Sequence, residues 1–342
     1  MDSSRVTLRK VAESLGIHHS TVSRALKNNP RIPAETRQRI QQAAKVMGYQ
    51  PDPALSALMV YRQNRATPQY HATLGWMTNE TTRDGWQRHE MMAYYRGATR
   101  RATELGYNLE HFWLGEPCLT QQRAIQILQA RNIRGLLFLP QRRSRAHLLL
   151  DWSRFTAISF GRTLAQPVFH NVHNNHYCSG SLLMRELKRL GYKRPGFAIW
   201  PRTNEAVDRS WMATFHAFQQ LPPQNQIPVF SKQPWKPAEF RRWFAQHTPD
   251  VVISHDETVL QWLESWGMRV PDEVGFALSA RHGEAPARCS GVDENNEMVA
   301  EVAINVLVDM LHRGEIGVPT TPISTLVHGR WVAGQTLRRQ RG

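Results

Sequence analysis

Apolar residues near the N-terminus recur at the spacing of short amphipathic helices. The first stripe is formed, at positions i, i+3, i+4 and i+7, by Leu8, Val11, Ala12 and Leu15. A second stripe consists of Val22, Ala25 and Leu26. Only the short segment Gly16-Ile17-His18 lies between them, which is enough for a tight turn. The pattern therefore predicts a helix-turn-helix unit.

A third helix is predicted over residues 33–47. Its inward face would hold Ile40, Ala43, Ala44 and Met47. Pro33 suits the first turn of this helix, and Gly48 is a natural residue to end it. Three short helices can bury one small core. Because the same spacing also occurs in unrelated helical bundles, the helices alone do not establish a function.

Polar side chains and charge indicate what this module binds. Ser20, Arg24 and Lys27 lie on the face of the second helix opposite the apolar stripe. An arginine can donate two parallel hydrogen bonds to guanine, and hydroxyl groups suit phosphate oxygens. Residues 1–65 carry 11 Lys or Arg against 4 Asp or Glu, a net charge of +7 in a chain of net charge +15. A solvated basic face is the alternative, but basic residues on a helix-turn-helix favour DNA.

The N-terminal segments closely resemble the headpiece of the lactose-repressor (LacI) family. The matching stretches are Val6-Thr7-Leu8-Arg9-Lys10-Val11-Ala12, Ser20-Thr21-Val22-Ser23-Arg24-Ala25-Leu26-Lys27-Asn28, Glu35-Thr36-Arg37-Gln38-Arg39-Ile40 and Met47-Gly48-Tyr49-Gln50-Pro51. The resemblance implies base-edge contacts for His19, Ser20 and Arg24, and phosphate contacts for Thr7, Thr21, Ser23 and Asn28. His18 departs from the family pattern, which usually has a serine helix cap there, and histidine is a poorer cap.

A short helix is predicted directly after this module, within residues 51–60. Asp52 can cap its N-terminus, and Pro53 fits its first position. The resemblance implies a hinge helix that orders on DNA, pairs with its dimer mate and inserts Leu58 into the minor groove as a wedge. The alternative is a linker whose Leu55 and Leu58 pack on the main domain. We expect a headpiece of residues 1–50, a hinge of residues 51–60 and a core of residues 61–342.

The rest of the chain alternates apolar strand-like runs with helical patterns. The runs in the first half are residues 73–77, 109–113 and 135–139, and those in the second half are residues 197–200, 251–253 and 274–278. This alternation predicts an α/β fold with parallel sheets covered by helices. Its recurrence in both halves predicts two similar lobes. Ligands of such folds bind at the carboxyl ends of the strands, so the cleft between the lobes is the expected pocket.

This core resembles the two-lobed, type I periplasmic-binding-protein-like domain that the same regulators share with sugar-binding proteins. The resemblance is carried by residues 190–195, 267–274 and 328–332. It implies three crossings of the chain between the lobes. We therefore expect an N-lobe of residues 70–165 and 292–320, and a C-lobe of residues 166–291 and 321–335.

Three residues are candidates for binding a small-molecule effector. The resemblance places Arg209 where the family has an arginine that binds effector hydroxyls or carboxylates, with a surface salt bridge as the alternative. His255 follows a strand and would face the cleft or be structural, and Trp86 would stack on a sugar ring or belong to the core. The family usually has an acidic residue after Gly275-Phe276, where this chain has Ala277-Leu278-Ser279. These differences favour an acidic effector, such as a sugar acid or phosphate.

Catalytic, metal and membrane motifs are absent from the sequence. There is no HExxH, no phosphate-binding loop and no GxSxG elbow, so we expect neither an enzyme nor a cofactor. His170, His173 and His176 lack the cysteine or carboxylate that would complete a metal site, and a segment near the pocket is the better interpretation. Without an apolar run long enough to span a membrane or a signal peptide, we expect a cytoplasmic, nucleoid-associated protein.

These observations predict a DNA-binding transcriptional regulator, most simply a repressor, that is controlled by a sugar or sugar derivative. Its expected partners are a pseudo-palindromic operator in double-stranded DNA, the effector and a second copy of the chain in a homodimer, because one headpiece makes few base contacts. The alternatives are a solute-binding protein and a sugar-metabolising α/β enzyme. The first would need a secretion signal and would not carry a basic headpiece.

Overall fold

The fold is taken from a computed structural model, which describes residues 8–26, 32–47, 49, 72–141, 146–148, 150–219, 222, 226–281 and 287–340. The N-terminal module contains the three expected helices, α1 (Leu8–Leu15), α2 (His19–Leu26) and α3 (Ala34–Val46). Its small core is formed by Val11, Ala12, Val22, Ala25, Ile40 and Ala44. Gly16 adopts a positive φ of 65° in the turn between α1 and α2, a conformation that glycine adopts without strain.

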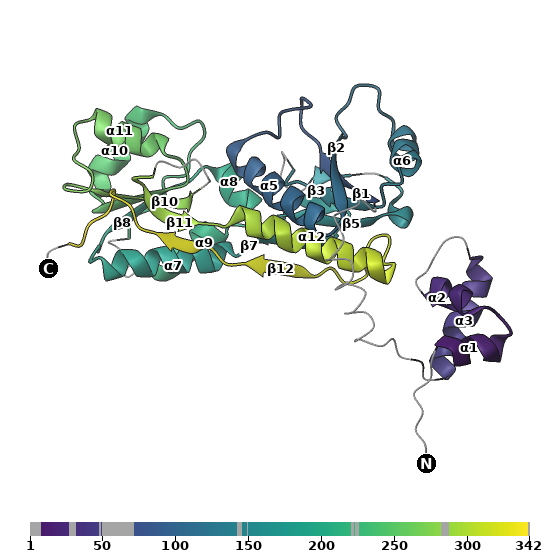
Figure 1. Ribbon diagram of the computed structural model, residues 1–342. Helices are drawn as coiled ribbons and strands as arrows, with labels where there is room; N and C mark the ends of the chain where they lie inside the picture. Colours follow the sequence, from purple (N-terminus) through teal and green to yellow (C-terminus); the bar gives the residue numbers. More distant parts are fainter. Residues whose placement is uncertain are drawn as a thin grey trace, which may run out of the picture.

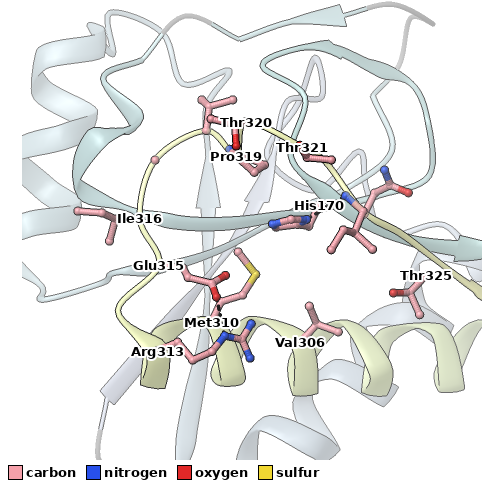
Figure 2. Close-up of a pocket in the computed structure, with 14 residues that line it drawn as sticks. His170, Val306, Met310, Arg313, Glu315, Ile316, Pro319, Thr320, Thr321 and Thr325 are labelled. Carbon is pink, nitrogen blue, oxygen red and sulfur yellow. Dashed lines mark hydrogen bonds and ion pairs between the residues drawn. The ribbon is translucent and has the colours of Figure 1, made fainter. Parts of the chain in front are cut away.

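The larger part of the chain forms two lobes, each built on its own sheet (Figure 1). The first sheet is parallel throughout and has the order β12-β7-β5-β3-β1-β2. Its strands are β1 (Ala72–Thr78), β2 (Tyr107–Trp113), β3 (Gly135–Phe138), β5 (Thr156–Phe160), β7 (His170–Asn174) and β12 (Ser324–Val327). Its helical segments are α5 (His89–Glu104), α6 (Gln121–Ala130), η1 (Trp152–Arg154) and α12 (Asn296–Arg313). After α12 the chain turns through residues 314–323 and enters β12 beside β7 (Figure 2).

The second sheet has the order β13-β11-β10-β9-β8 and is parallel except for β13. Its strands are β8 (Pro195–Ala198), β9 (Val251–Ser254), β10 (Gly275–Arg281), β11 (Ser290–Asp293) and β13 (Arg330–Val332). Its helices are α7 (His176–Arg189), α8 (Pro201–Ala206), α9 (Ser210–Phe218), α10 (Pro237–His247) and α11 (Thr258–Ser265). A two-stranded ribbon of β4 (Ala146–His147) and β6 (Leu164–Gln166) completes the described strands. The predicted pair of α/β lobes is thus confirmed.

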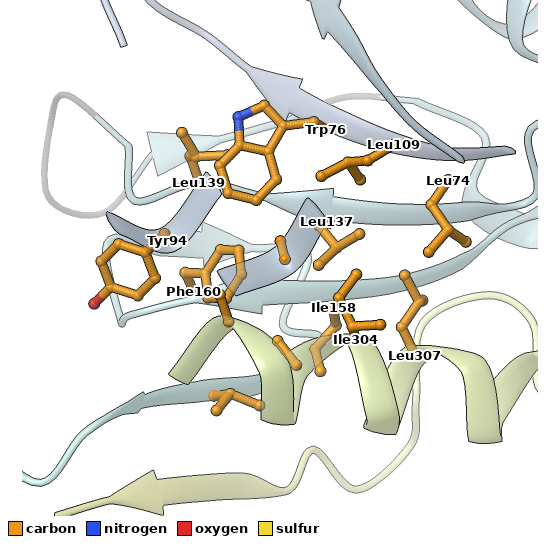
Figure 3. Packing of buried hydrophobic residues seen from close by; sticks show 14 of the residues in the cluster. Leu74, Trp76, Tyr94, Leu109, Leu137, Leu139, Ile158, Phe160, Ile304 and Leu307 are labelled. Carbon is orange, nitrogen blue, oxygen red and sulfur yellow. The ribbon is translucent and has the colours of Figure 1, made fainter. Parts of the chain in front are cut away.

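Successive residues of each strand point to opposite faces of the sheet, and each face packs against its own helices. In the first lobe, side chains such as Trp76, Leu137 and Ile158 pack against α5 and α12, as Figure 3 shows. The neighbouring residues on these strands, among them Met77 and Phe138, point to the other face and pack against α6 and η1. The second lobe is built in the same way, with α7 and α9 on one face and α10 and α11 on the other. Each sheet is therefore buried on both faces, as parallel sheets require.

Helices α5 and α12 approach each other closely at one point. A Cβ atom added at Gly97 would lie 2.2 Å from the backbone oxygen of Glu297. Only a residue without a side chain fits there. Arginines of α5 and glutamates of α12 pair across the solvent-exposed side of the same contact, through Arg96–Glu297, Arg100–Glu297 and Arg100–Glu301.

The chain passes between the lobes three times, but two crossings differ from the expected positions. Residues 170–174 and 324–327 were expected in the C-lobe, whereas β7 and β12 lie in the first sheet. The third crossing follows Asp293, close to the expected residue 292. The sequence His-Asn-Val-His-Asn of β7 hides its strand character, because its polar side chains form hydrogen bonds at both ends of the strand, His170 with the backbone of Ile323 and Asn174 with the backbone of Glu294. In the part of the chain that the structure describes, every helix is too short or too polar to cross a bilayer.

Candidate functional sites

Helix α2 presents its polar face away from the small helical core. Val22 and Ala25 are buried against α1 and α3, while His19 and Arg24 are exposed and Ser20 is partly exposed. His18, directly before the helix, accepts a hydrogen bond at Nδ1 from the backbone N–H of Ser20 over 3.4 Å. The imidazole thus occupies the acceptor position of an N-cap side chain, where the family has a serine.

The described residues include only some of the predicted DNA contacts. Thr21 lies on α2 and is partly exposed, and Ser23 belongs to the same helix. Thr7, Asn28, Leu58 and the whole expected hinge, residues 51–60, lie outside the described residues. The geometry of α2 therefore describes His19, Ser20, Arg24 and Thr21, and all of the DNA contacts, including the wedge, remain expectations.

A cavity of about 440 Å³ lies between the two lobes. Its walls come from residues that follow the strands of both sheets, including Gln141 after β3, Thr163 after β5 and Trp200 after β8. This is the carboxyl edge of both sheets, where open α/β folds bind ligands. Its size is within the range of small-molecule sites.

The floor of this inter-lobe cavity is a chain of buried hydrogen bonds. Tyr94 Oη donates to Asn174 Oδ1 over 2.7 Å, and Asn174 Nδ2 donates to the backbone oxygen of Glu294 over 2.6 Å and to Asn296 Oδ1 over 3.0 Å. His176 Nδ1 lies 2.7 Å from Glu294 Oε1. Burial, with the nearby Glu294, raises the pKa of the Tyr94 hydroxyl well above its usual value. The network joins α5, β7 and both neighbouring crossovers, so it fixes the polar groups at the junction of the lobes.

His173 offers a defined hydrogen-bonding group to the cavity. Its Nδ1 donates to the backbone oxygen of Asn174 over 2.9 Å, which leaves the lone pair of the neutral ring on Nε2. Burial lowers the pKa of His173, and the neighbouring His176 and Arg162 act in the same direction. The neutral ring is favoured, and it presents an acceptor. Of the three histidines that the sequence placed near the pocket, His173 and His176 line this cavity.

Charged groups of both signs line the inter-lobe cavity. Its guanidinium groups belong to Arg88 and Arg202, and its carboxylates to Glu90, Asp256 and Glu294. Arg88 is itself paired with Glu80 at 2.8 Å. The expected excess of positive charge is therefore not found among the described lining residues. The segment after Gly275-Phe276 lacks the acidic residue that is usual in the family. Asp256 and Glu294 supply carboxylates to the cavity from other segments.

The three effector candidates lie in different environments. His255 lines the inter-lobe cavity, with its ring edge-to-face against Trp200 and Trp235. Arg209 does not line it: the residue is exposed, has a left-handed φ of 58° and precedes α9. Trp211, two residues later, is in the wall instead.

Trp86 requires a correction, because the structure places it in the hydrophobic core. It is 4% exposed and packs against Trp76, Tyr95 and His111 rather than lining the cavity. The aromatic residue that the cavity exposes is Trp200, which sequence reasoning missed. Its position two residues after β8, at the carboxyl end of the predicted run of residues 197–200, was the available signal.

Comparisons with known proteins agree with this architecture. Residues 7–52 match the family model described as bacterial regulatory proteins, lacI family. The HTH-type transcriptional regulator MalR of Staphylococcus xylosus is 21% identical over 254 residues, which are 73% of this chain and 73% of that protein.

Two solved structures share the fold of nearly the whole chain. A transcriptional regulator CelR–cellobiose complex has a TM-score of 0.57 and 17% identity, covering 97% of this chain and all of that one. The Lac repressor dimer bound to operator and the anti-inducer ONPF has a TM-score of 0.54 and 16% identity, covering 97% and 99%. The chain thus joins a headpiece that matches the model of the lacI family of bacterial regulatory proteins to a two-lobed core that has the fold of the CelR and Lac repressor structures.

Proposed function

We propose that this regulator is controlled by an uncharged sugar bound in the inter-lobe cavity, and that it binds a pseudo-palindromic operator as a homodimer. The observation that carries the choice of ligand is the lining of the cavity, which combines an exposed aromatic face with neutral donors and acceptors and has no excess of positive charge among its described arginines and carboxylates. A sugar has an apolar ring face and a rim of hydroxyl groups, each both a donor and an acceptor.

Trp200 is the proposed stacking surface for the sugar ring. It is 37% exposed, in contrast to the buried Trp211, and its ring is supported from the side by Trp235 and His255. Gln141, Thr203 and the acceptor Nε2 of His173 surround the same space and would bind hydroxyl groups. A sugar ring bound between an aromatic face and such polar groups exchanges its hydrogen bonds to water for hydrogen bonds to the protein, so few of its hydroxyl groups are left without a partner.

The DNA-binding part of the proposal assigns roles to the headpiece. His19, Ser20 and Arg24 would contact base edges, as the exposure of α2 permits. Thr7, Thr21, Ser23 and Asn28 would contact phosphates, and Leu58 would act as the minor-groove wedge. In a homodimer, two copies of α2 would read half-sites about one helical turn apart.

Effector and DNA would be coupled through the lobes. A sugar that binds more tightly to one arrangement of the lobes than to another increases the population of that arrangement. The separation of the paired DNA-binding modules would change with it. By linkage, operator DNA must then change the affinity for the sugar by the same factor. We place this activity in the cytoplasm, where the operator is found.

Calorimetry with matched sugars tests the ligand. We expect a neutral disaccharide, such as cellobiose or maltose, to bind more tightly than glucuronate or glucose 6-phosphate. The variant W200A should lose binding by about tenfold or more, W200F should keep part of it, and W266F, outside the cavity, should leave it unchanged. Tight binding of the anionic compounds alone would contradict the proposal.

Selection of bound DNA from a random pool, with and without the sugar panel, tests the proposed operator and its response to the effector. We expect an inverted repeat whose recovery changes with the active sugar. The variant L58A should lose discrimination between operator and random DNA, whereas K27A should weaken both similarly. An unchanged ratio for L58A would contradict the wedge.

A binding function without catalysis is part of the proposal. The matched relatives are transcriptional regulators, which favours a regulator over a sugar-metabolising enzyme. We expect no turnover when the purified protein is incubated with the sugars it binds. Product formation that W200A abolishes would support the enzyme instead.

A further inference from the structure

The end of the second lobe that lies away from the inter-lobe cavity is rich in basic residues. It is formed by the segment between α7 and β8 together with the last described residues of the chain. The basic residues of these segments are Lys188, Arg189, Lys193, Arg194, Arg338 and Arg339. All are exposed except Arg194, which is half-buried. We propose that this surface, the cationic end, binds the phosphate backbone of double-stranded DNA independently of its sequence, as a contact separate from the headpiece.

Backbone hydrogen bonds hold the two segments of the cationic end together. The N–H of Gln340 donates to the backbone oxygen of Leu190 over 2.8 Å, which seats the C-terminal segment across the end of α7. The N–H of Arg338 donates to the hydroxyl oxygen of Tyr192 over 3.2 Å, although 146 positions separate the two residues. Residues 338–340 therefore adjoin residues 190–192, and their basic side chains belong to one surface.

Carboxylates compensate only part of this charge. Arg189 Nη2 lies 2.8 Å from Glu186 Oε2, and Arg338 Nη1 lies 3.7 Å from Asp272 Oδ1. The carboxylate of Asp250 accepts the backbone N–H groups of residues 193 and 194, at 2.7 and 3.0 Å. Water screens the two ion pairs, because their arginine side chains are 66% and 45% exposed. The cationic end thus keeps a positive charge.

Three of its cations have no carboxylate partner in the described part of the chain: Lys188, Lys193 and Arg339. Lys188 and Arg189 belong to the last turn of α7, where cations stabilise the negative end of the helix dipole. The dipole explains these two positions. It does not explain Lys193 or Arg339, which lie outside the helix. Their charges are available to an anionic partner.

The absence of apolar anchors favours a phosphate backbone over a protein surface. The large exposed apolar residues of the described chain all lie elsewhere, and Tyr192 and Leu337, beside the cations, are buried. Protein interfaces bury aromatic anchors and are depleted of lysine. A membrane surface also attracts cations, but stable attachment needs a second, apolar anchor. Exposed cations suffice for DNA, because they release its counterions.

The position of the cationic end indicates that it contacts a separate segment of DNA. The carboxyl edges of both sheets face the inter-lobe cavity, so their amino edges are at the two far ends of the core. The first sheet begins its strand β1 at Ala72, on the side of the chain that leads to the headpiece. The cationic end is at the amino edge of the second sheet, where β8 begins. It is therefore opposite to the end at which the headpiece joins the core.

Fluorescence anisotropy on the full-length protein tests this proposal. The variant R24E/K27E first weakens the headpiece contact. We expect it still to bind a duplex of arbitrary sequence and about 30 base pairs at about 50 mM salt. Adding K188E/K193E should weaken binding by about tenfold or more. The slope of log Kd against log salt should also fall by about two, about one for each lost phosphate contact.

Matched variants separate a local contact from a general effect of charge. R83E/R123E, added to the same headpiece variant, reverses two exposed arginines of the first lobe and should change both quantities little. K193E/R339E leaves α7 unchanged and should reproduce the effect of K188E/K193E. The thermal unfolding temperature of K193E/R339E should equal that of the parent protein, because both side chains are exposed.

Two results would overturn the proposal. The first is failure of the headpiece variant to bind the duplex at low salt. The second is an equal loss of binding for K193E/R339E and R83E/R123E. Vesicles of phosphatidylserine and phosphatidylcholine are the competing probe. If K193E/R339E lost binding to vesicles but kept binding to the duplex, the cationic end would be a membrane contact and the DNA proposal would be wrong.

Discussion

The guanidinium of Arg162 and the carboxylate of Asp208 meet at 3.3 Å, although they belong to different lobes. Arg162 follows β5 in the first lobe, and Asp208 lies between α8 and α9 in the second. The neighbouring residues Gly161, Thr163 and Val207 line the inter-lobe cavity, so the pair spans its border. Asp208 adopts a left-handed φ of 54°, which is uncommon for a residue with a side chain. The ion pair thus links the two lobes directly.

Breaking this pair should alter effector binding modestly. Both side chains are more than half exposed, and exposed ion pairs contribute little. We expect R162Q and D208N each to change the Kd of the active sugar by about two- to fivefold, and the double variant to change it no further. Titrations at low and high salt measure this. Additive effects of the two substitutions would mean that the residues act separately.

Arg24 should contribute to sequence discrimination rather than to general affinity. If its exposed guanidinium contacts a guanine, R24A should reduce the ratio of operator to random-DNA affinity by about tenfold or more. The matched control is R39A, which removes an exposed arginine of α3. Fluorescence anisotropy with both DNAs provides the ratio. Equal effects of R24A on the two DNAs would assign Arg24 to phosphate contact.

His173 should make the folded protein sensitive to mild acid. Burial lowers its pKa in the folded state, whereas the unfolded chain has the ordinary value of about 6.5. Below that pH the unfolded state therefore binds the proton more readily, and the free energy of unfolding falls as the pH falls. Above it, both states hold a neutral ring and the effect disappears.

Thermal unfolding between pH 8 and pH 5 measures this effect. The parent protein should lose more stability over this range than H173Q. H147Q, which replaces an exposed histidine, should behave like the parent. Parallel pH profiles of H173Q and the parent would show that another group is responsible.

Gly97 should be required for the packing of α5 on α12. The Cβ atom of alanine would lie 2.2 Å from the Glu297 oxygen, so the helices must separate. We expect G97A to lower the free energy of unfolding by about 1–3 kcal/mol in urea denaturation. E104A, at the exposed end of α5, is the control and should have little effect. A stability equal to that of the parent would mean that the helices adjust without loss.

Local patterns in the sequence determined the elements of this fold. The stripes that include Val11 and Val22 predicted two helices, because the spacing of apolar residues alone decides which helix face is buried. Repeated apolar runs separated by helical patterns predicted two lobes for the same reason. The boundaries were predicted less well where polar residues form a strand, as in residues 170–174.

Tertiary structure decided which side chains meet. Trp86 lies in the segment after the predicted run of residues 73–77, and Trp200 ends the predicted run of residues 197–200, yet Trp86 is in the core and Trp200 lines the inter-lobe cavity. Likewise, His173 and Glu294 are far apart in sequence and reach the same cavity through separate crossovers. Periodicity reports whether a residue faces inward, but strand order and the path between the lobes determine what it faces. The physical reason is that a cavity between two sheets is formed by distant segments, whose convergence no local pattern encodes.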